Sequence, residues 1–314
     1  NILIIAYLVG LAIGIHLLNL LAFPFLALII YYKKYPFRPV SFLTVIILTG
    51  IAFGVIYLGI IKGIPNLLDK TGLSMTIIII LGIFAATAYF IKSKKTLLAT
   101  LLACLSLVLV GYSTYTTIFI RAVQNPAINE NSPDTIAGAI SYLNREQYGD
   151  WDILNRKSTL QRPENTYWKR YTLNRGKPKP KEVRDFIWNY QVKEMYLRYF
   201  AWQFIGKGEM DWPVINKKGT LLRYKEGINS TRYIIPLAFI IGMIGMVFHF
   251  QQDWRRALAV LALFVTTGLL IILYLNQYDP QPRERDYSYV GSFFTFSIWI
   301  GIGIAGIADW ISKL

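Results

Sequence analysis

The sequence holds little that could bind a metal ion or a haem. Its 314 residues include one cysteine, Cys104, and two histidines, His16 and His249. A lone cysteine allows no internal disulfide, and the two histidines are predicted to lie on opposite faces of the protein. This supply of ligands excludes a conventional His/Cys metal or haem site. We therefore expect no metal site.

Charged residues are also scarce, at 16% of the chain, whereas hydrophobic residues make up 54%. Soluble proteins carry roughly 25% charged residues. The sequence has no phosphate-binding P-loop and no Gly-x-Ser-x-Gly nucleophile motif. Asp150-Trp-Asp152 matches the D-x-D pattern of soluble glycosyltransferases, but no nucleotide-binding αβ pattern surrounds it. We predict an all-α integral membrane protein.

The net charge of +15 is dispersed between the apolar segments and one large loop. Such a distribution argues against nucleic acid as a partner, and anionic membrane lipids account for it.

The chain begins at Asn1 with apolar residues and no basic n-region, so we expect no signal peptide and a numbering that starts inside a longer protein.

Seven apolar segments are long enough to be membrane helices. They are 2–32, 39–61, 73–91, 96–120, 232–250, 257–278 and 288–311. The first contains Pro24, so we expect a helix to about Leu21, a break, and a short helix ending near Tyr32. The chain then divides into transmembrane helices 1–4 (1–120), a soluble loop domain (121–231) and transmembrane helices 5–7 (232–314).

Basic residues predict the orientation of these helices. One set of short connections holds nine basic residues and one acid, Asp253; the basic residues are Lys33, Lys34, Arg38, Lys92, Lys94, Lys95, Arg255, Arg256 and Lys313. The connections of the other set are balanced in charge. The positive-inside rule places the first set in the cytoplasm. We expect a multi-pass protein of the inner membrane, with the loop domain on the periplasmic, exoplasmic face.

The loop domain is rich in tryptophan and tyrosine. Within it, 182–205 shows apolar residues near 3.6 spacing and reads as an amphipathic helix. This helix could pack inside the loop domain or lie at the membrane interface.

The most informative stretch is the turn that carries Arg283, Glu284, Arg285 and Asp286, followed by Tyr287. Uncharged apolar runs flank it on both sides, so it must lie close to the hydrocarbon boundary. Such a cluster is either a solvated hairpin tip or a set of groups that bind a polar ligand at the membrane surface. We favour the second interpretation.

A second polar stretch opens the large loop, with Arg121, Asn129, Glu130 and Asn131. Asn and Pro are ordinary turn residues, so turn structure alone could explain it. Because it should share a face with the 283–286 turn, we hypothesise that it is a second wall of the same site.

In the first apolar segment, His16 and Asn19 are three residues apart and should face the same side of a helix. Polar groups in that setting can mark function, although a His satisfied by a neighbouring helix is more common.

Four motifs resemble a family of large multi-span membrane proteins found in Bacteroidetes. They are Gly14-Ile-His-Leu-Leu-Asn19, Asn125-Pro-Ala-Ile-Asn-Glu-Asn131, Tyr142-Leu-Asn-Arg-Glu-Gln-Tyr-Gly149 and Arg283-Glu-Arg-Asp-Tyr-Ser-Tyr-Val-Gly-Ser292. The family is grouped with GT-C membrane glycosyltransferases and is related to an animal endoplasmic-reticulum protein O-mannosyltransferase. The resemblance implies a GT-C-like bundle that takes a sugar from a polyprenyl-phosphate carrier on the exoplasmic face.

The predicted function is therefore transfer of a lipid-linked sugar to an extracytoplasmic acceptor, expected to be protein. Arg283 and Arg285 would neutralise the leaving phosphate, and Glu284 and Asp286 would orient them or contact sugar hydroxyls. The resemblance places the catalytic carboxylate upstream of Asn1. The alternative is a non-catalytic membrane subunit of a larger envelope complex. A transporter is disfavoured because intramembrane ionisable residues are nearly absent apart from His16.

Overall fold

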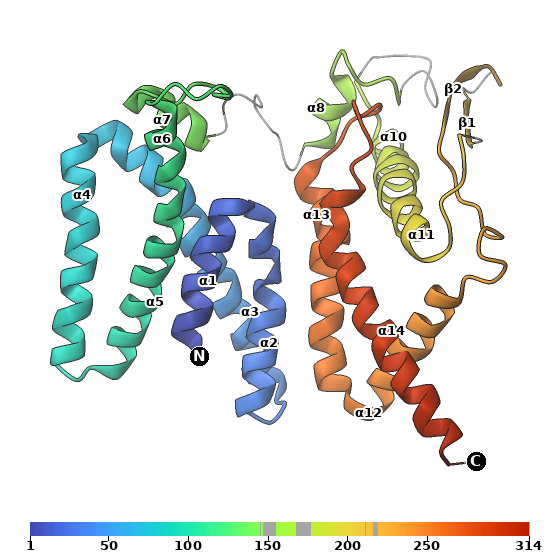
Figure 1. Ribbon diagram of the computed structural model, residues 1–314, viewed down its shortest axis with the longest axis horizontal. Helices are drawn as coiled ribbons and strands as arrows, with labels where there is room; N and C mark the ends of the chain where they lie inside the picture. The colour runs from blue at the N-terminus through green and yellow to red at the C-terminus, as the bar shows by residue number, and fades with distance from the viewer. Residues whose placement is uncertain (145, 147–154, 168–176, 211, 216–218, 314) are drawn as a thin grey trace. The chain divides into compact units, whose positions relative to one another are not determined.

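The computed structural model describes residues 1–314 except 145, 147–154, 168–176, 211, 216–218 and 314. The chain forms two compact units (Figure 1). Unit 1 comprises Asn1–Phe23 and Pro39–Trp151, and unit 2 comprises Pro24–Arg38 and Asp152–Leu314. Helices dominate the described part of both units, which confirms the predicted all-α, multi-helix membrane protein.

Five helical stretches are long and apolar enough to cross a membrane. They are Leu17–Lys34, Pro39–Lys92, Thr96–Ala122, Leu237–Leu275 and Asp286–Ile311, and the shorter Ile2–Ile15 is also apolar. The second, of 54 residues, would measure about 80 Å as one straight helix, far more than the hydrocarbon core of about 30 Å. It breaks at Gly72, where φ is 77°. The fourth breaks at Asp253, which has φ −148° and ψ 76°. Both breaks lie between segments that the sequence separates, 39–61 from 73–91 and 232–250 from 257–278.

Unit 1 is built from helices alone in its described residues. In chain order they are α1 (Ile2–Ile15), the 3₁₀ turn η1 (Leu17–Ala22), α3 (Pro39–Gly54), the π-helical η2 (Val55–Ile61), α4 (Gly63–Lys92), α5 (Thr96–Tyr112), η3 (Ser113–Tyr115), α6 (Thr116–Ala122) and α7 (Ile136–Asn144).

The first apolar segment breaks earlier than the sequence suggested. α1 ends at Ile15, and His16 has an extended backbone, with φ −156° and ψ 125°. The expected helix to about Leu21 was therefore wrong, although a break does precede Pro24. Pro24 lies in the first turn of the next helix, where a missing N–H costs nothing.

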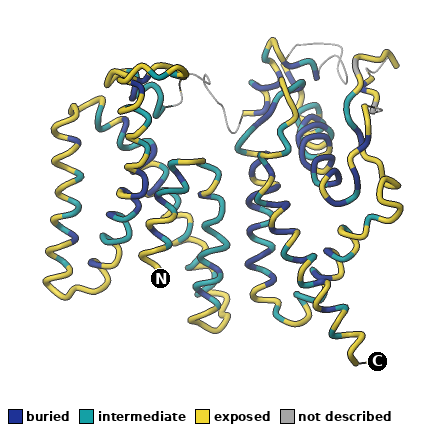
Figure 2. Tube along the Cα trace, in the orientation of Figure 1, coloured by how far each residue is buried: buried dark blue, intermediate teal, exposed yellow. Residues whose placement is uncertain are grey.

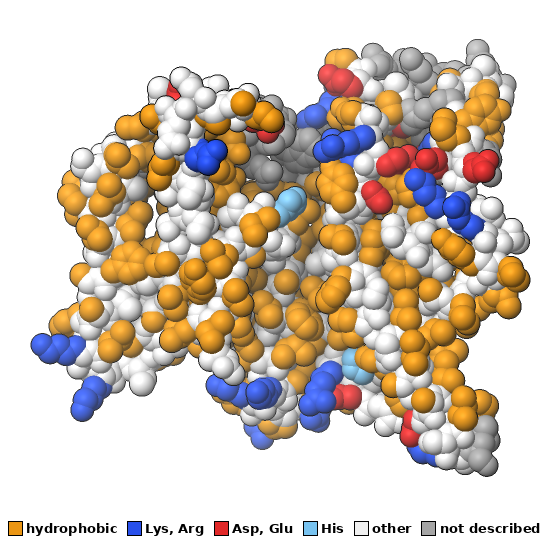
Figure 3. All heavy atoms as spheres, in the orientation of Figure 1, with side chains coloured by type: hydrophobic (Ala, Val, Ile, Leu, Met, Phe, Trp, Pro, Cys, Tyr) orange, Lys and Arg blue, Asp and Glu red, His pale blue; other side chains and the backbone are white. Residues whose placement is uncertain are grey.

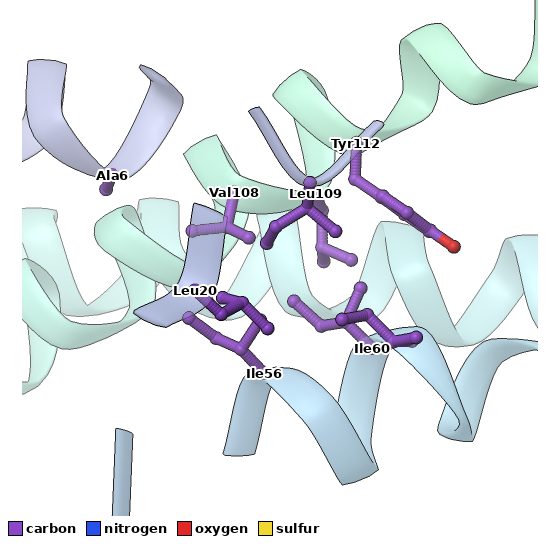
Figure 4. Packing of buried hydrophobic residues seen from close by; sticks show 9 residues of the cluster. Ala6, Leu20, Ile56, Ile60, Val108, Leu109 and Tyr112 are labelled. Carbon is purple, nitrogen blue, oxygen red and sulfur yellow. The ribbon is translucent and has the colours of Figure 1, made fainter. Parts of the chain in front are cut away.

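The core of unit 1 lies where α1, η1, η2 and α5 meet (Figure 4). Its buried apolar side chains include Leu20, Ile56 and Leu109. α1 and α5 approach so closely that a Cβ on Gly111 would collide with the backbone of α1 at Tyr7. In contrast, α3 has no buried residue and presents apolar side chains outward, as a lipid-facing helix does.

Unit 2 contains helices and one small antiparallel hairpin in its described part. In chain order the elements are α2 (Phe23–Lys34), α8 (Arg156–Gln161), α10 (Pro180–Asp185), the π-helical η5 (Phe186–Leu197), α11 (Arg198–Phe204), β1 (Trp212–Ile215), β2 (Leu221–Lys225), α12 (Leu237–Thr267), α13 (Leu269–Leu275), the 3₁₀ turn η6 (Asp286–Tyr289) and α14 (Val290–Ile311).

The predicted helix over 182–205 is confirmed as the continuous run α10–η5–α11. Figure 2 shows this run and the helices beside it as the most buried part of unit 2. It packs inside the unit, because Phe200 and Phe204 of α11 contact Phe296 of α14 with ring centroids 4.9 and 4.6 Å apart. Phe264 of α12 joins the same aromatic cluster, 5.8 Å from Phe200.

The segment expected as one loop domain, 121–231, is divided between the units after Trp151. Its exoplasmic placement stays a prediction. Within unit 2, however, two of the predicted cytoplasmic connections do meet, since the rings of Tyr32 and Phe37 pack against Trp254, 6.1 and 5.2 Å away. The 283–286 turn lies at the other end of the helices that start from Trp254.

Candidate functional site

The turn that joins α13 to η6 begins as buried chain. Asn276 ends α13 in the left-handed conformation, with φ 40°, which Asn tolerates better than most residues. The side chain of Gln191 donates a hydrogen bond to the Gln277 carbonyl (3.0 Å), and the Tyr190 hydroxyl donates to the Tyr278 carbonyl (2.7 Å). The first half of the turn is therefore fixed to the helix η5 before the 283–286 cluster begins.

Glu284 does not pair with the arginines beside it in the sequence. Its carboxylate accepts two hydrogen bonds from the guanidinium of Arg198, at 3.3 and 2.7 Å, and a third from the Tyr199 hydroxyl. The Tyr199 hydroxyl also accepts a hydrogen bond from the backbone N–H of Arg285 (3.1 Å). Glu284 thus anchors the turn to α11, and a role for it in binding sugar hydroxyls or orienting the neighbouring arginines stays a prediction.

Arg198 is almost completely buried, with 2% of its side chain exposed. Its guanidinium lies against the rings of Tyr199 and Trp202, 4.6 and 4.5 Å from their centroids. Burial alone would raise the pKa of the Glu284 carboxyl. The hydrogen bonds from Arg198 and Tyr199, with the positive charge of Arg198, outweigh burial and lower this pKa below its ordinary value. Burial and the bond to Glu284 raise the pKa of Tyr199, so its hydroxyl stays a donor.

Three other charged residues of the turn are Arg283, Arg285 and Asp286. No ion pair involving Arg283, Arg285 or Asp286 occurs within the described part of the chain. Arg283 is exposed and lies over the ring of Tyr287, 5.6 Å from its centroid. Arg285 is half-buried, and its Nε atom is buried without a hydrogen-bond partner among the described residues. Figure 3 shows acidic and basic side chains gathered beside one another over this upper part of unit 2.

In unit 1, the polar stretch at the end of α6 forms a shallow pocket of about 260 Å³. Arg121, Asn129 and Glu130 line it, together with apolar side chains such as Ile118. Asn129 also donates a hydrogen bond to the carbonyl of Ala122 (3.3 Å), which ties the loop to the helix end.

Asn131 is not among the residues that line this pocket. It is exposed and adopts a left-handed conformation, with φ 59°, as a turn residue does. The pocket and the 283–286 turn belong to different units, and the hypothesis of a shared site stays a prediction.

His16 and Asn19 do not share one face of a helix, because the helix ends between them. His16 Nδ1 accepts a hydrogen bond from the backbone N–H of Leu18 (3.2 Å). Asn19 donates from its side chain to the carbonyl of Ala12 (2.8 Å). His16 thus caps the start of η1, and Asn19 adds a second hydrogen bond to the Ala12 carbonyl, which also accepts the His16 N–H (2.8 Å). A structural role is sufficient to explain them.

Two further expectations concern metals and the D-x-D pattern. The described residues contain no group of His, Cys, Asp or Glu side chains that could hold a metal ion. Asp150 and Asp152 lie outside the described residues, as does most of the motif 142–149 after Asn144.

Sequence reasoning missed Arg198. Its partner Glu284 is 86 positions further along the chain, so no local pattern connects them. One signal was available, because Arg198 lies between Met195 and Tyr199 on the apolar face of the predicted amphipathic helix. A charge on such a face needs a buried partner.

Comparison with known protein families gives a match at the start of the chain. Residues 1–38 match the family model described as the N-terminal domain of the protein O-mannosyl-transferase TMEM260. The matched segment contains α1, the break at His16 and α2. No curated protein and no solved structure matches the chain.

Proposed function

We propose that this chain is part of a membrane glycosyltransferase that moves a sugar from a polyprenyl-phosphate carrier to a protein hydroxyl on the extracytoplasmic side. The match of residues 1–38 to a protein O-mannosyl-transferase family is the observation that carries the proposal. The apolar helices, which suit a lipid-linked donor, support it.

The donor phosphate would bind at the 283–287 turn. Transfer breaks the bond between the sugar C1 and the phosphate oxygen, so the polyprenyl phosphate leaves with additional negative charge, and positively charged donors that are already in place stabilise such charge. Arg283 and Arg285 are suited to this role, because a guanidinium forms paired hydrogen bonds to phosphate oxygens and neither has an ion-pair partner in the described chain. Asp286 would accept hydrogen bonds from sugar hydroxyls.

The pocket at the end of α6 would hold hydroxyl groups of the sugar or of the acceptor. Arg121 and Glu130 offer donors and acceptors of opposite charge, and Asn129 offers an amide. Sugar transfer also needs a general base for the acceptor hydroxyl, and we assign that role to no residue of this chain. The GT-C classification belongs to the proposal as well.

The test is glycosylation of extracytoplasmic proteins in cells whose only copy carries Arg283→Ala or Arg285→Ala. Each variant should lose the glycans while its abundance in the membrane stays normal. Arg256→Ala is the matched control, because Arg256 pairs with Asp253 at the opposite end of the helix and should leave glycosylation intact.

Two other outcomes would reject this role. If both alanine variants glycosylate normally, the turn is a solvated hairpin. If they disappear from the membrane or leave a larger complex, the arginines are structural, and the alternative of a non-catalytic membrane subunit is favoured.

A further inference from the structure

Arg198 is held in place by contacts that do not involve the turn. Its Nε donates to the carbonyl of Glu194 in the preceding helical turn (2.9 Å). Its Nη1 donates to the carbonyl of Glu226, just beyond β2 (2.8 Å). Since Trp202 also donates from its ring to the neighbouring Gly227 carbonyl (2.6 Å), the helix and the hairpin form one fixed base around the guanidinium.

The turn docks onto this fixed base through Glu284. The two carboxylate oxygens meet two separate guanidinium nitrogens, so both the position and the orientation of Glu284 are defined. Tyr199 also fixes the position of the next residue, because its hydroxyl donates a hydrogen bond to Glu284 and accepts one from the backbone N–H of Arg285. On either side of Glu284 lie Arg283 and Arg285, for which no ion pair occurs among the described residues.

We infer that Arg198 is a positioning residue, which holds the 283–285 turn so that Arg283 and Arg285 face one anionic group together. The inference rests on the proposed function for the identity of that group, a prenyl phosphate. A ligand that needs both arginines binds only the fraction of molecules in which the turn is ordered, so its apparent affinity falls in proportion to that fraction.

The fold of unit 2 does not depend on this ion pair alone. The aromatic cluster of Phe200, Phe204, Phe264 and Phe296 joins α11 to α12 and α14 without it. Tyr199→Phe is therefore a mild variant, because it removes the hydroxyl that contacts Glu284 and Arg285 and keeps the ring on which Arg198 lies. Arg198→Lys keeps the charge but cannot make the same set of bonds.

The experiment combines backbone hydrogen exchange over 281–289 with binding of a short-chain prenyl phosphate to the full-length protein in detergent. Tyr199→Phe and Arg198→Lys should each speed exchange in this segment and weaken prenyl phosphate binding about tenfold. The double variant should be little worse than Arg198→Lys, since both changes act on one contact. Lys207→Ala removes a pair with Glu226 near the same tryptophan and is the control expected to change neither readout.

Unchanged exchange in Tyr199→Phe and Arg198→Lys, or additive effects in the double variant, would overturn the positioning role. If Arg198→Lys fails to accumulate, Tyr199→Phe decides alone. A third outcome separates the two proposals: if exchange rises in the variants but the wild-type protein binds no prenyl phosphate, the positioning role stands and the proposed donor is wrong.

Discussion

Replacing Phe296 by alanine should weaken the packing of α11 against the membrane helices that support it. The ring of Phe296 is 2% exposed and contacts those of Phe200, Phe204 and Phe239. Truncating a buried Phe to Ala costs about 3–5 kcal/mol in water-soluble cores. Because α14 is an apolar membrane helix, part of the transfer term is absent, so we expect the lower end, about 3 kcal/mol.

The assay is thermal unfolding of the purified protein in detergent, followed by tryptophan fluorescence. Phe294→Ala is the matched control, because Phe294 lies two residues away on the same helix and is 64% exposed. Phe296→Ala should lower the midpoint by several degrees relative to Phe294→Ala. Equal midpoints for the two variants would refute the claim that the helix over 180–204 is packed on α12 and α14.

Three further predictions concern topology, proximity and pH. Single cysteines on the predicted cytoplasmic side should resist an impermeant thiol reagent in intact cells, and those on the other side should react; the first set is Lys34, Lys94 and Arg256, and the second is Lys179 and Ser288. Side chains of 125–131 and 283–286 should approach to about 6 Å, so that a short crosslinker joins cysteines at Asn129 and Arg283 but not at Asn129 and Arg256. The lowered pKa of Glu284 means that its anchor is complete above pH 4.5, the ordinary value, and is lost as the pH falls through the depressed one. Acid should therefore loosen the turn in the wild type and have little further effect in Glu284→Gln.

The membrane helices could be predicted from the sequence, because a helix that can cross a membrane is recognised by the length and apolar composition of its segment. The helix over 182–205 could also be predicted, since its apolar spacing follows the helical period and its aromatic face is buried. These features depend on residues that are near one another in the chain.

The break at His16 and the partner of Glu284 could not be predicted, for two different reasons. The apolar run continues through Leu17 and Leu18, so composition gives no sign that α1 ends there with an extended His16. Glu284 lies beside two arginines in the sequence, yet a buried arginine on another helix holds it, because backbone carbonyls have already fixed that guanidinium. Local charge patterns identify the turn but not the roles within it.

The most direct test of the central claim is sugar transfer by the full-length protein in lipid vesicles. The donor is a radiolabelled mannose on a polyprenyl phosphate, and the acceptor is a peptide rich in serine and threonine. The wild type should label the peptide, and Arg285→Ala should lower the rate about 30- to 900-fold, equivalent to roughly 2–4 kcal/mol of lost transition-state stabilisation. Arg256→Ala should transfer at the wild-type rate. Equal rates for Arg285→Ala and the wild type would contradict the account.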